Sequence, residues 1–273
     1  MKKLIILALV GILISIPAYS KTDKTSVEYL KNRKHFSIMN PTAERIAQKI
    51  IKKLLKNESG NNFNVKLKGY TLSSMKQGIF KHLEIEGKDF FVEGIPVPYA
   101  KIKTLTDYNW IDYKEDPPIC RTNMEFEYFV NLSEESINTA LQKEEYTKKL
   151  NTLNEIAYPL FIAKEVKVKL KENRLYIIMK YNFPISPMQN DKHFIMASDF
   201  KVENNNIIAK NIKLNKAYGA MQLDKIANLI NKLDPLTFTL SLMNTKKCNA
   251  KIENVKINDD LVEINGKIFV EGD

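Results

Sequence analysis

The chain has 273 residues, with 42 Lys or Arg against 32 Asp or Glu, so its formal net charge is +10. Hydrophobic residues make up 44% of it and charged residues 27%, which are globular proportions that exclude wholesale disorder. Three His and two Cys leave few ligands for a zinc or iron–sulfur site, so we expect no metal and no cofactor.

The first twenty residues have the pattern of a secretory signal peptide. Met1-Lys2-Lys3 is a basic start, residues 4–16 form an apolar run, and Ala18-Tyr19-Ser20 places small residues before a cleavage point. A retained membrane anchor is the alternative, but the run is shorter than the ~20 residues that span a bilayer. We therefore expect a periplasmic or extracellular protein, which meets an anionic membrane surface rather than nucleic acid.

After a polar lead-in over residues 21–39, the pattern predicts an amphipathic helix. Asn40 suits the N-cap and Pro41 the first helical position. The apolar residues that recur at helical spacing, which we expect to form one stripe, are Ile46, Ala47, Ile50, Ile51, Leu54 and Leu55. Basic residues fall mainly on the other side, among them Arg45, Lys49 and Lys53. They form either a solvated face or a contact for anionic head groups, which contributes about 1 kcal/mol per residue.

Beyond this helix the hydrophobic period changes from 3.6 to 2. Four strand patterns lie between Phe63 and Val130, and Ser133 is suited to cap a second helix. Strand–turn–strand units follow over residues 166–181 and 194–214, then a third helix over 223–233 and a closing hairpin over 247–270. No alternation of strand and helix appears, so we predict an α+β fold with long antiparallel strands, as a single domain over residues 40–273.

The search for catalytic groups favours a protein that is not an enzyme. Asp191, His193, Ser198 and Asp199 are close in sequence, but in a strand His193 and Ser198 point to opposite faces. The pair Glu125/Glu127 is typical of a solvated strand face rather than an acid–base pair.

The two cysteines, Cys120 and Cys248, are candidates for a disulfide in an oxidising compartment. A reactive thiol is the alternative, and it lacks a local signature. Spacing in the sequence does not show whether the two side chains lie close together.

Two segments, Leu175–Tyr181 and Phe90–Val92, are apolar at both parities of a strand. Such a strand needs cover on both faces, or one of its faces lines a cavity. The first interpretation is a core covered by helices. The second is a lipid-sized groove between a sheet and a helix, in which burial of each acyl methylene is favourable by roughly 0.8 kcal/mol.

The order of motifs resembles the LmeA-like phospholipid-binding family of exported bacterial proteins. The resemblance spans about residues 40–271. The segments that carry it are the helix at 43–55 with Phe63-Asn64-Val65, the stretch 78–96, the strand-into-helix step at 130–138 and the hairpin at 255–266. It implies a long, curved antiparallel sheet wrapped on two or three amphipathic helices, similar to tubular lipid-binding (bactericidal/permeability-increasing-like) domains. It also implies lipid binding in the cell envelope.

We therefore expect an exported protein that binds phospholipid acyl chains non-covalently in an apolar groove and takes part in envelope lipid transport or maintenance. The candidate lining residues are Ile46, Ile50, Leu54, Phe80, Leu83, Ile177, Met179, Ile226 and Ile230. The head-group candidates are Arg45, Lys49 and Lys53. The alternative is an envelope structural or adaptor protein with a filled core, and a hydrolase ranks last.

Overall fold

The computed structural model describes residues 40–59, 62–112, 115, 119–157, 162–182, 192–203, 206–214, 234–243 and 248–272. Several expectations lie outside these residues: the signal peptide, the lead-in over 21–39, the helix over 223–233, and with it Ile226 and Ile230. Among the described residues no helix is long and apolar enough to cross a bilayer.

One part of the molecule is built on a six-stranded antiparallel sheet. In spatial order its strands are β1 (Phe63–Lys68), β3 (His82–Val92), β4 (Ile95–Thr104), β7 (Met124–Ser133), β13 (Leu261–Val270) and β12 (Cys248–Ile257). Helix α3 (Asn40–Ser59) packs along β1 at the edge of this sheet. A short helix, α4 (Leu72–Lys76), and three small strands, β2 (Ile79–Phe80), β5 (Asn109–Asp112) and β6 (Ile119–Cys120), complete this part.

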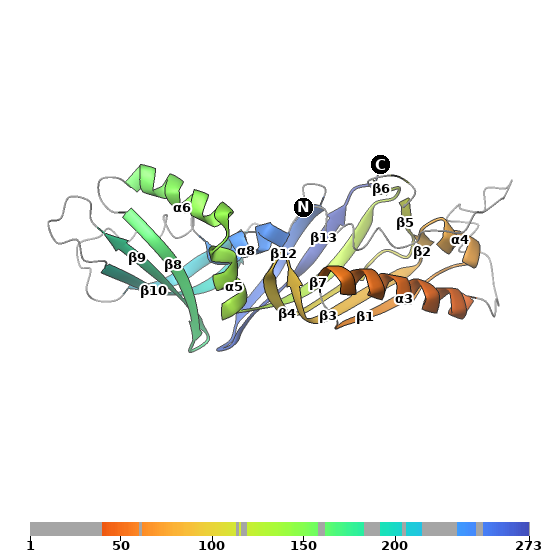
Figure 1. Cartoon of the computed structure of the whole chain (residues 1–273), viewed down its shortest axis with the longest axis horizontal. Coiled ribbons are helices and arrows are strands. Elements are labelled where there is room, and N and C mark those ends of the chain that lie inside the picture. The colour runs from red at the N-terminus through yellow and green to blue at the C-terminus, as the bar shows by residue number, and fades with distance from the viewer. Residues whose placement is uncertain are drawn as a thin grey trace.

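The other part is a four-stranded antiparallel sheet. Its strands are β11 (Asn206–Leu214), β10 (Lys192–Glu203), β9 (Arg174–Asn182) and β8 (Ile162–Lys171). Helices α5 (Glu134–Leu141) and α6 (Glu144–Ala157) pack against β8, and α8 (Pro235–Met243) packs against α5 and β11. The molecule is elongated, with the two sheets toward opposite ends and α8 between them (Figure 1). The prediction of an α+β fold dominated by antiparallel strands is confirmed.

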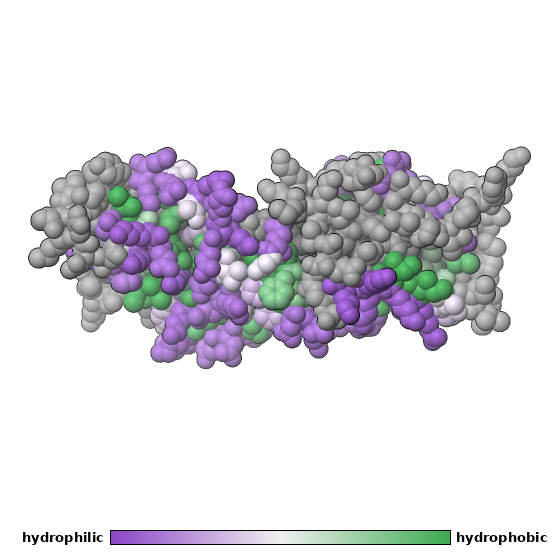
Figure 2. Space-filling model, viewed as in Figure 1, coloured by the Kyte–Doolittle hydropathy of each residue, from purple (hydrophilic) through white to green (hydrophobic). Residues whose placement is uncertain are grey.

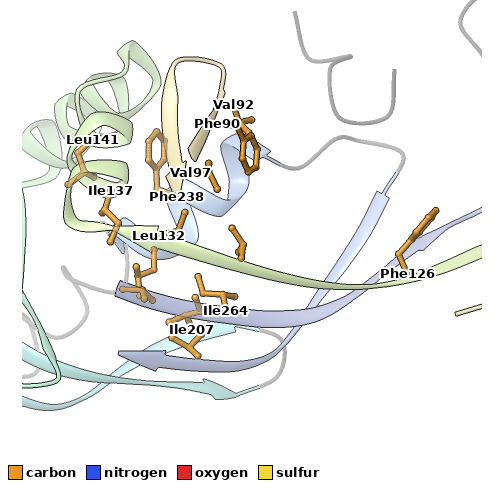
Figure 3. Close-up of a cluster of buried hydrophobic side chains, with 14 of the residues drawn as sticks. Phe90, Val92, Val97, Phe126, Leu132, Ile137, Leu141, Ile207, Phe238 and Ile264 are labelled. Atoms are coloured by element: carbon orange, nitrogen blue, oxygen red, sulfur yellow. The ribbon is translucent and has the colours of Figure 1, made fainter. Parts of the chain in front are cut away.

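A continuous hydrophobic core joins the two sheets. Leu132 of β7 and Ile264 of β13 are fully buried where Ile137 of α5 and Phe238 of α8 approach the six-stranded sheet (Figure 3). Ile207 of β11 belongs to the same cluster, so the four-stranded sheet shares this core. The junction between the sheets is therefore packed with the protein's own side chains.

The outer face of the six-stranded sheet carries rows of ion pairs. Lys66 of β1 and Lys101 of β4 both approach Glu84 of β3, at 2.9 and 3.3 Å between the charged atoms. Lys103 pairs with Glu127 of β7. Inward-facing residues of the same strands are buried, so the alternation predicted for these strands is confirmed.

Local sequence signals placed several elements correctly. Ser133 is the N-cap of α5, where its hydroxyl accepts from the amide of Ser136 and the Ser136 hydroxyl accepts from the amide of Ser133. The β8–β9 turn lies within the strand–turn–strand unit expected over residues 166–181. It has positive φ at Glu172 (54°) and Asn173 (55°), the geometry of a two-residue hairpin turn. Helices α4, α6 and α8 were not predicted as separate elements. Helix α4 is only five residues long, and α6 begins within a polar stretch that follows α5.

Candidate functional site

Helix α3 is fixed to the edge of the six-stranded sheet by one flank. The Gln48 side-chain amide donates to the Leu67 carbonyl at 3.1 Å, and the Gly69 amide donates to a Glu44 carboxylate oxygen at 3.0 Å. Lys68 adds an ion pair to Glu44 at 3.7 Å. These contacts with the end of β1 set the rotation of the helix about its own axis.

The apolar residues of α3 form two stripes instead of the single stripe predicted. Ala47, Ile51 and Leu55 repeat at four-residue spacing and are buried against the sheet. Ile46 and Ile50 lie one position earlier, about 100° around the helix, and their exposed fractions are 55% and 37%. The structure thus turns the second stripe outward.

The three head-group candidates are exposed next to this outward stripe. Arg45, Lys49 and Lys53 also repeat at four-residue spacing, and Arg45 and Lys49 directly precede Ile46 and Ile50 in the chain. A hydrophobic patch lies over α3 with hydrophilic side chains beside it (Figure 2). We call Arg45, Ile46, Lys49, Ile50 and Lys53 the α3 surface. Leu54 is on the same helix, and its side chain lies outside the described part of the structure.

The other lining candidates are not brought together with the α3 surface. Phe80 in β2 and Leu83 in β3 are buried in the part that contains the six-stranded sheet. Ile177 and Met179 are buried in β9, in the other sheet. All four are shielded by neighbouring atoms of the chain. Of the described lining candidates, four are therefore buried in the core, two beside each sheet, and Ile46 and Ile50 lie on the outer surface of α3.

The residues that resembled a hydrolase cluster do not form one. His193 is exposed, whereas Ser198 is fully buried and its hydroxyl donates to the Asp199 carbonyl at 3.0 Å. The two side chains lie on opposite faces of β10, as their spacing predicted. Asp191 lies outside the described residues. The Glu125/Glu127 pair takes part in ion pairs with lysines on the outer face of the sheet, which is the solvated strand face that we expected.

The described residues provide no evidence for a metal site or for a reactive cysteine. Within the described ranges no three His, Cys, Asp or Glu side chains are grouped so that they could hold a metal ion. Cys120 is buried in β6, and Cys248 is the first residue of β12. The proposed pairing of these two cysteines stays a prediction.

The junction holds a buried carboxyl that the sequence reasoning missed. Asp234 precedes α8, where its carboxylate accepts from the Leu236 amide at 3.0 Å and from the Thr237 hydroxyl. Burial raises the pKa of Asp234, against these hydrogen bonds and the charge of Lys149, which lower it. The Asp-Pro step at residues 234–235 is a helix-start signal that could have located α8. Because the carboxylate is occupied by the helix end, this is a structural cap.

An aromatic contact ties α6 to the same junction. The rings of Tyr146 and Phe238 are 4.8 Å apart in an edge-to-face arrangement, and the Lys149 ammonium lies 5.9 Å from the centre of the Phe238 ring. Burial raises the pKa of Tyr146 and lowers that of Lys149. These contacts hold α6 and α8 together.

Comparison of the chain with protein-family models, with curated proteins and with solved structures finds no match. The geometry of the α3 surface and of the two sheets is therefore the basis for a functional proposal.

Proposed function

We propose that the mature chain is an exported, non-enzymatic protein that binds anionic phospholipid and serves envelope lipid transport or maintenance. The observation that carries this proposal is the α3 surface, where two exposed isoleucines lie beside three exposed basic side chains. Helices with an apolar stripe next to Lys and Arg lie in the plane of a membrane interface. The expected signal peptide and the resemblance to the LmeA-like family agree with this assignment.

The size of the expected effect follows from two contributions. Each Lys or Arg near an anionic leaflet contributes about 1 kcal/mol, and apolar area removed from water contributes about 25 cal/mol per Å². Three basic and two isoleucine side chains together support reversible binding rather than permanent anchoring. Because the contribution of the basic residues is electrostatic, binding weakens as salt concentration rises.

We also propose that the fold is of the tubular lipid-binding kind, with a long curved sheet wrapped on helices. The elongated shape and the long antiparallel strands support this assignment. An acyl chain would then lie between sheet and helices, and organic extraction of the purified protein followed by mass spectrometry tests for it. Recovery of phospholipid in a fixed ratio to protein is the expected result.

The filled-core alternative, a structural or adaptor protein of the envelope, also has an observation in its favour. Phe80, Leu83, Ile177 and Met179, which we expected to line a groove, are all buried among the protein's own atoms. An extract that is consistently empty of lipid, together with vesicle binding that depends on α3, would favour a protein that binds the membrane surface without carrying lipid.

Sedimentation with vesicles tests the α3 surface directly. Wild-type protein is expected to pellet with vesicles of phosphatidylglycerol and phosphatidylcholine and to stay in solution with phosphatidylcholine alone. Replacement of Arg45, Lys49 and Lys53 by Gln is expected to reduce this difference strongly. The matched control replaces Lys101, Lys103 and Lys267 on the outer face of the six-stranded sheet by Gln, which removes the same charge elsewhere. Equal loss in both triple variants would contradict a specific role for α3.

A further inference from the structure

The outer face of the four-stranded sheet carries apolar side chains. On β9 the side chains of Leu175, Ile177 and Met179 point inward and are buried. The intervening Tyr176 and Ile178 lie on the outer face and are only half-buried. The outer face of the six-stranded sheet carries ion pairs together with the Tyr99–Phe129 ring pair and the exposed Phe269. What marks the four-stranded sheet is that its outward apolar side chains lie beside a row of lysines, and this combination indicates a contact surface.

Strand register brings these apolar side chains together. Ile178 of β9 lies directly opposite Ile195 of β10, and it lies opposite Lys167 of β8 on its other side. Tyr176 is the next outward residue of β9 and lies opposite Lys169 of β8. We call Tyr176, Ile178 and Ile195 the outer patch. Its border on β8 consists of Lys167 and Lys169, which are both exposed.

The charge of this sheet indicates what the patch contacts. Strands β8, β9 and β10 with the β8–β9 turn carry eight Lys or Arg against four Asp or Glu, a net charge of +4. Some of this charge is balanced locally, since Lys167 pairs with Glu165 at 2.7 Å and Arg174 with Asp199 at 3.3 Å. An apolar centre with a basic border is complementary to an amphiphile whose head group is anionic.

We propose that the outer patch is a second attachment surface for anionic phospholipid. This proposal rests on the proposed function and extends it from one surface to two. The four-stranded sheet and α3 lie toward opposite ends of the elongated molecule, so the two surfaces are separate (Figure 1). Because both belong to one chain, attachment at one surface raises the effective concentration of the other, and the two together bind more tightly than either alone.

Four proteins test the second surface by sedimentation with phosphatidylglycerol vesicles. The first is wild type, the second carries Ile178→Thr with Ile195→Thr, the third carries Ile46→Ser with Ile50→Ser, and the fourth carries all four changes. The outer-patch variant is expected to bind about tenfold more weakly than wild type, which corresponds to about 1.4 kcal/mol. The α3 variant is expected to keep a residual affinity that the fourth protein loses.

A matched control and a folding control keep the outcomes distinct. Phe269→Thr removes an apolar side chain that is 43% exposed on the outer face of the six-stranded sheet. Phe269 lies opposite Glu125 rather than opposite a lysine, so this variant is expected to bind as wild type does. Near-ultraviolet circular dichroism checks the folding of each variant. If the outer-patch variant does not fold, Lys167→Gln with Lys169→Gln removes the basic border and is expected to lower both the affinity and its salt dependence.

The outcomes separate the two proposals. An outer-patch variant that binds as tightly as the Phe269→Thr control would overturn the second surface and leave binding through α3 intact. If wild-type protein does not bind phosphatidylglycerol vesicles, the proposed function and the second surface both fail. If the outer-patch variant binds more weakly while the α3 variant binds as wild type does, the result supports the second surface and contradicts the role of α3.

Discussion

The edge strands β8 and β1 are both protected by helices, but the bonding differs. On β8, Asn138 of α5 exchanges two hydrogen bonds with the backbone of Val168, at 2.8 and 3.0 Å. Asn154 of α6 exchanges two with the backbone of Ala163, both at 2.8 Å. Each asparagine thus imitates the pairing of a further strand, which prevents another chain from adding to this edge.

On β1, two side chains of α3 each make a single hydrogen bond with the backbone, and another side of the helix stays exposed. Gln48 and Glu44 each make one hydrogen bond with the backbone at or just after the end of β1. The buried stripe of α3 packs inward, while Ile46 and Ile50 stay exposed. Helices α5 and α6 therefore cover the edge of β8 as part of the structure. Helix α3 covers the edge of β1 and also carries an outward surface that is available for a partner.

The largest predicted effect contrasts an inward with an outward isoleucine. Ile137 of α5 is fully buried at the junction, so Ile137→Ala leaves a cavity and is expected to lower the free energy of unfolding by about 2–5 kcal/mol. Ile46→Ala on α3 is expected to change it by less than about 0.5 kcal/mol, because the side chain is exposed. Urea denaturation followed by circular dichroism measures both. Similar losses in the two variants would contradict the division between cover and contact surface.

The next effect compares the two kinds of edge bonding. Asn138→Ala leaves the amide and carbonyl of Val168 without these bonds and is expected to cost about 1–3 kcal/mol. Gln48→Ala removes one bond and is expected to cost about 0.5–1.5 kcal/mol. Urea denaturation gives the two costs, and light scattering shows whether opening the edge of β8 promotes self-association. A larger cost for Gln48→Ala would reverse the comparison.

The strands and capped helices were predictable because their signals are local. Alternating apolar residues in β7, the Ser133 cap and the β8–β9 turn each follow from a few neighbouring residues. Helix α6 was missed because its stability comes from tertiary contacts, such as Tyr146 with Phe238 and Asn154 with β8, that no local pattern shows. Assembly of the six-stranded sheet depends on the pairing of β7 with β13, which are distant in sequence, and spacing cannot reveal that pairing.

The sequence correctly predicted which residue types α3 carries, but the prediction that its apolar residues form one stripe was wrong. The sequence placed apolar and basic residues on α3 at helical spacing, and the exposure of Arg45, Lys49 and Lys53 agrees with a head-group role. It could not show which of two adjacent apolar stripes faces the sheet, because Glu44 and Gln48 determine that rotation through bonds to the end of β1. It likewise could not show that Ile177 lies in the four-stranded sheet, whereas α3 packs on the six-stranded sheet.

The pH dependence of stability distinguishes the buried cap from the surface. Burial raises the pKa of Asp234 above the ordinary Asp value of 3.8, so the folded protein holds this proton more readily than the unfolded chain. The contribution of this group to stability is therefore fully present below the unfolded pKa and is lost as pH rises through the folded value. Asp234→Asn keeps a carbonyl acceptor for the Leu236 amide and does not titrate.

Urea denaturation over a pH series tests this assignment. The free energy of unfolding of wild type is expected to fall relative to that of Asp234→Asn as pH rises from acid to neutral. The control is Asp260→Asn at an exposed turn, which is expected to follow wild type. A difference that grows in the opposite direction would show that hydrogen bonds to the carboxylate, rather than its burial, dominate at the junction.

The smallest predicted effect concerns the ion pairs on the outer face of the six-stranded sheet. The hydrogen bond from Lys66 lowers the pKa of Glu84, so this stabilisation is present above the unfolded pKa of a Glu and is lost as pH falls through the folded value. Lys66 is well exposed and Lys101 remains beside Glu84, so Lys66→Gln is expected to cost about 0–1 kcal/mol.

Salt provides the check on this last prediction. High salt screens exposed charges, so the unfolding free energies of Lys66→Gln and wild type are expected to converge as ionic strength rises. A cost above about 2 kcal/mol that persists at high salt would exceed what a surface pair contributes. The outer face of the six-stranded sheet would then be part of the structural framework rather than a solvated surface.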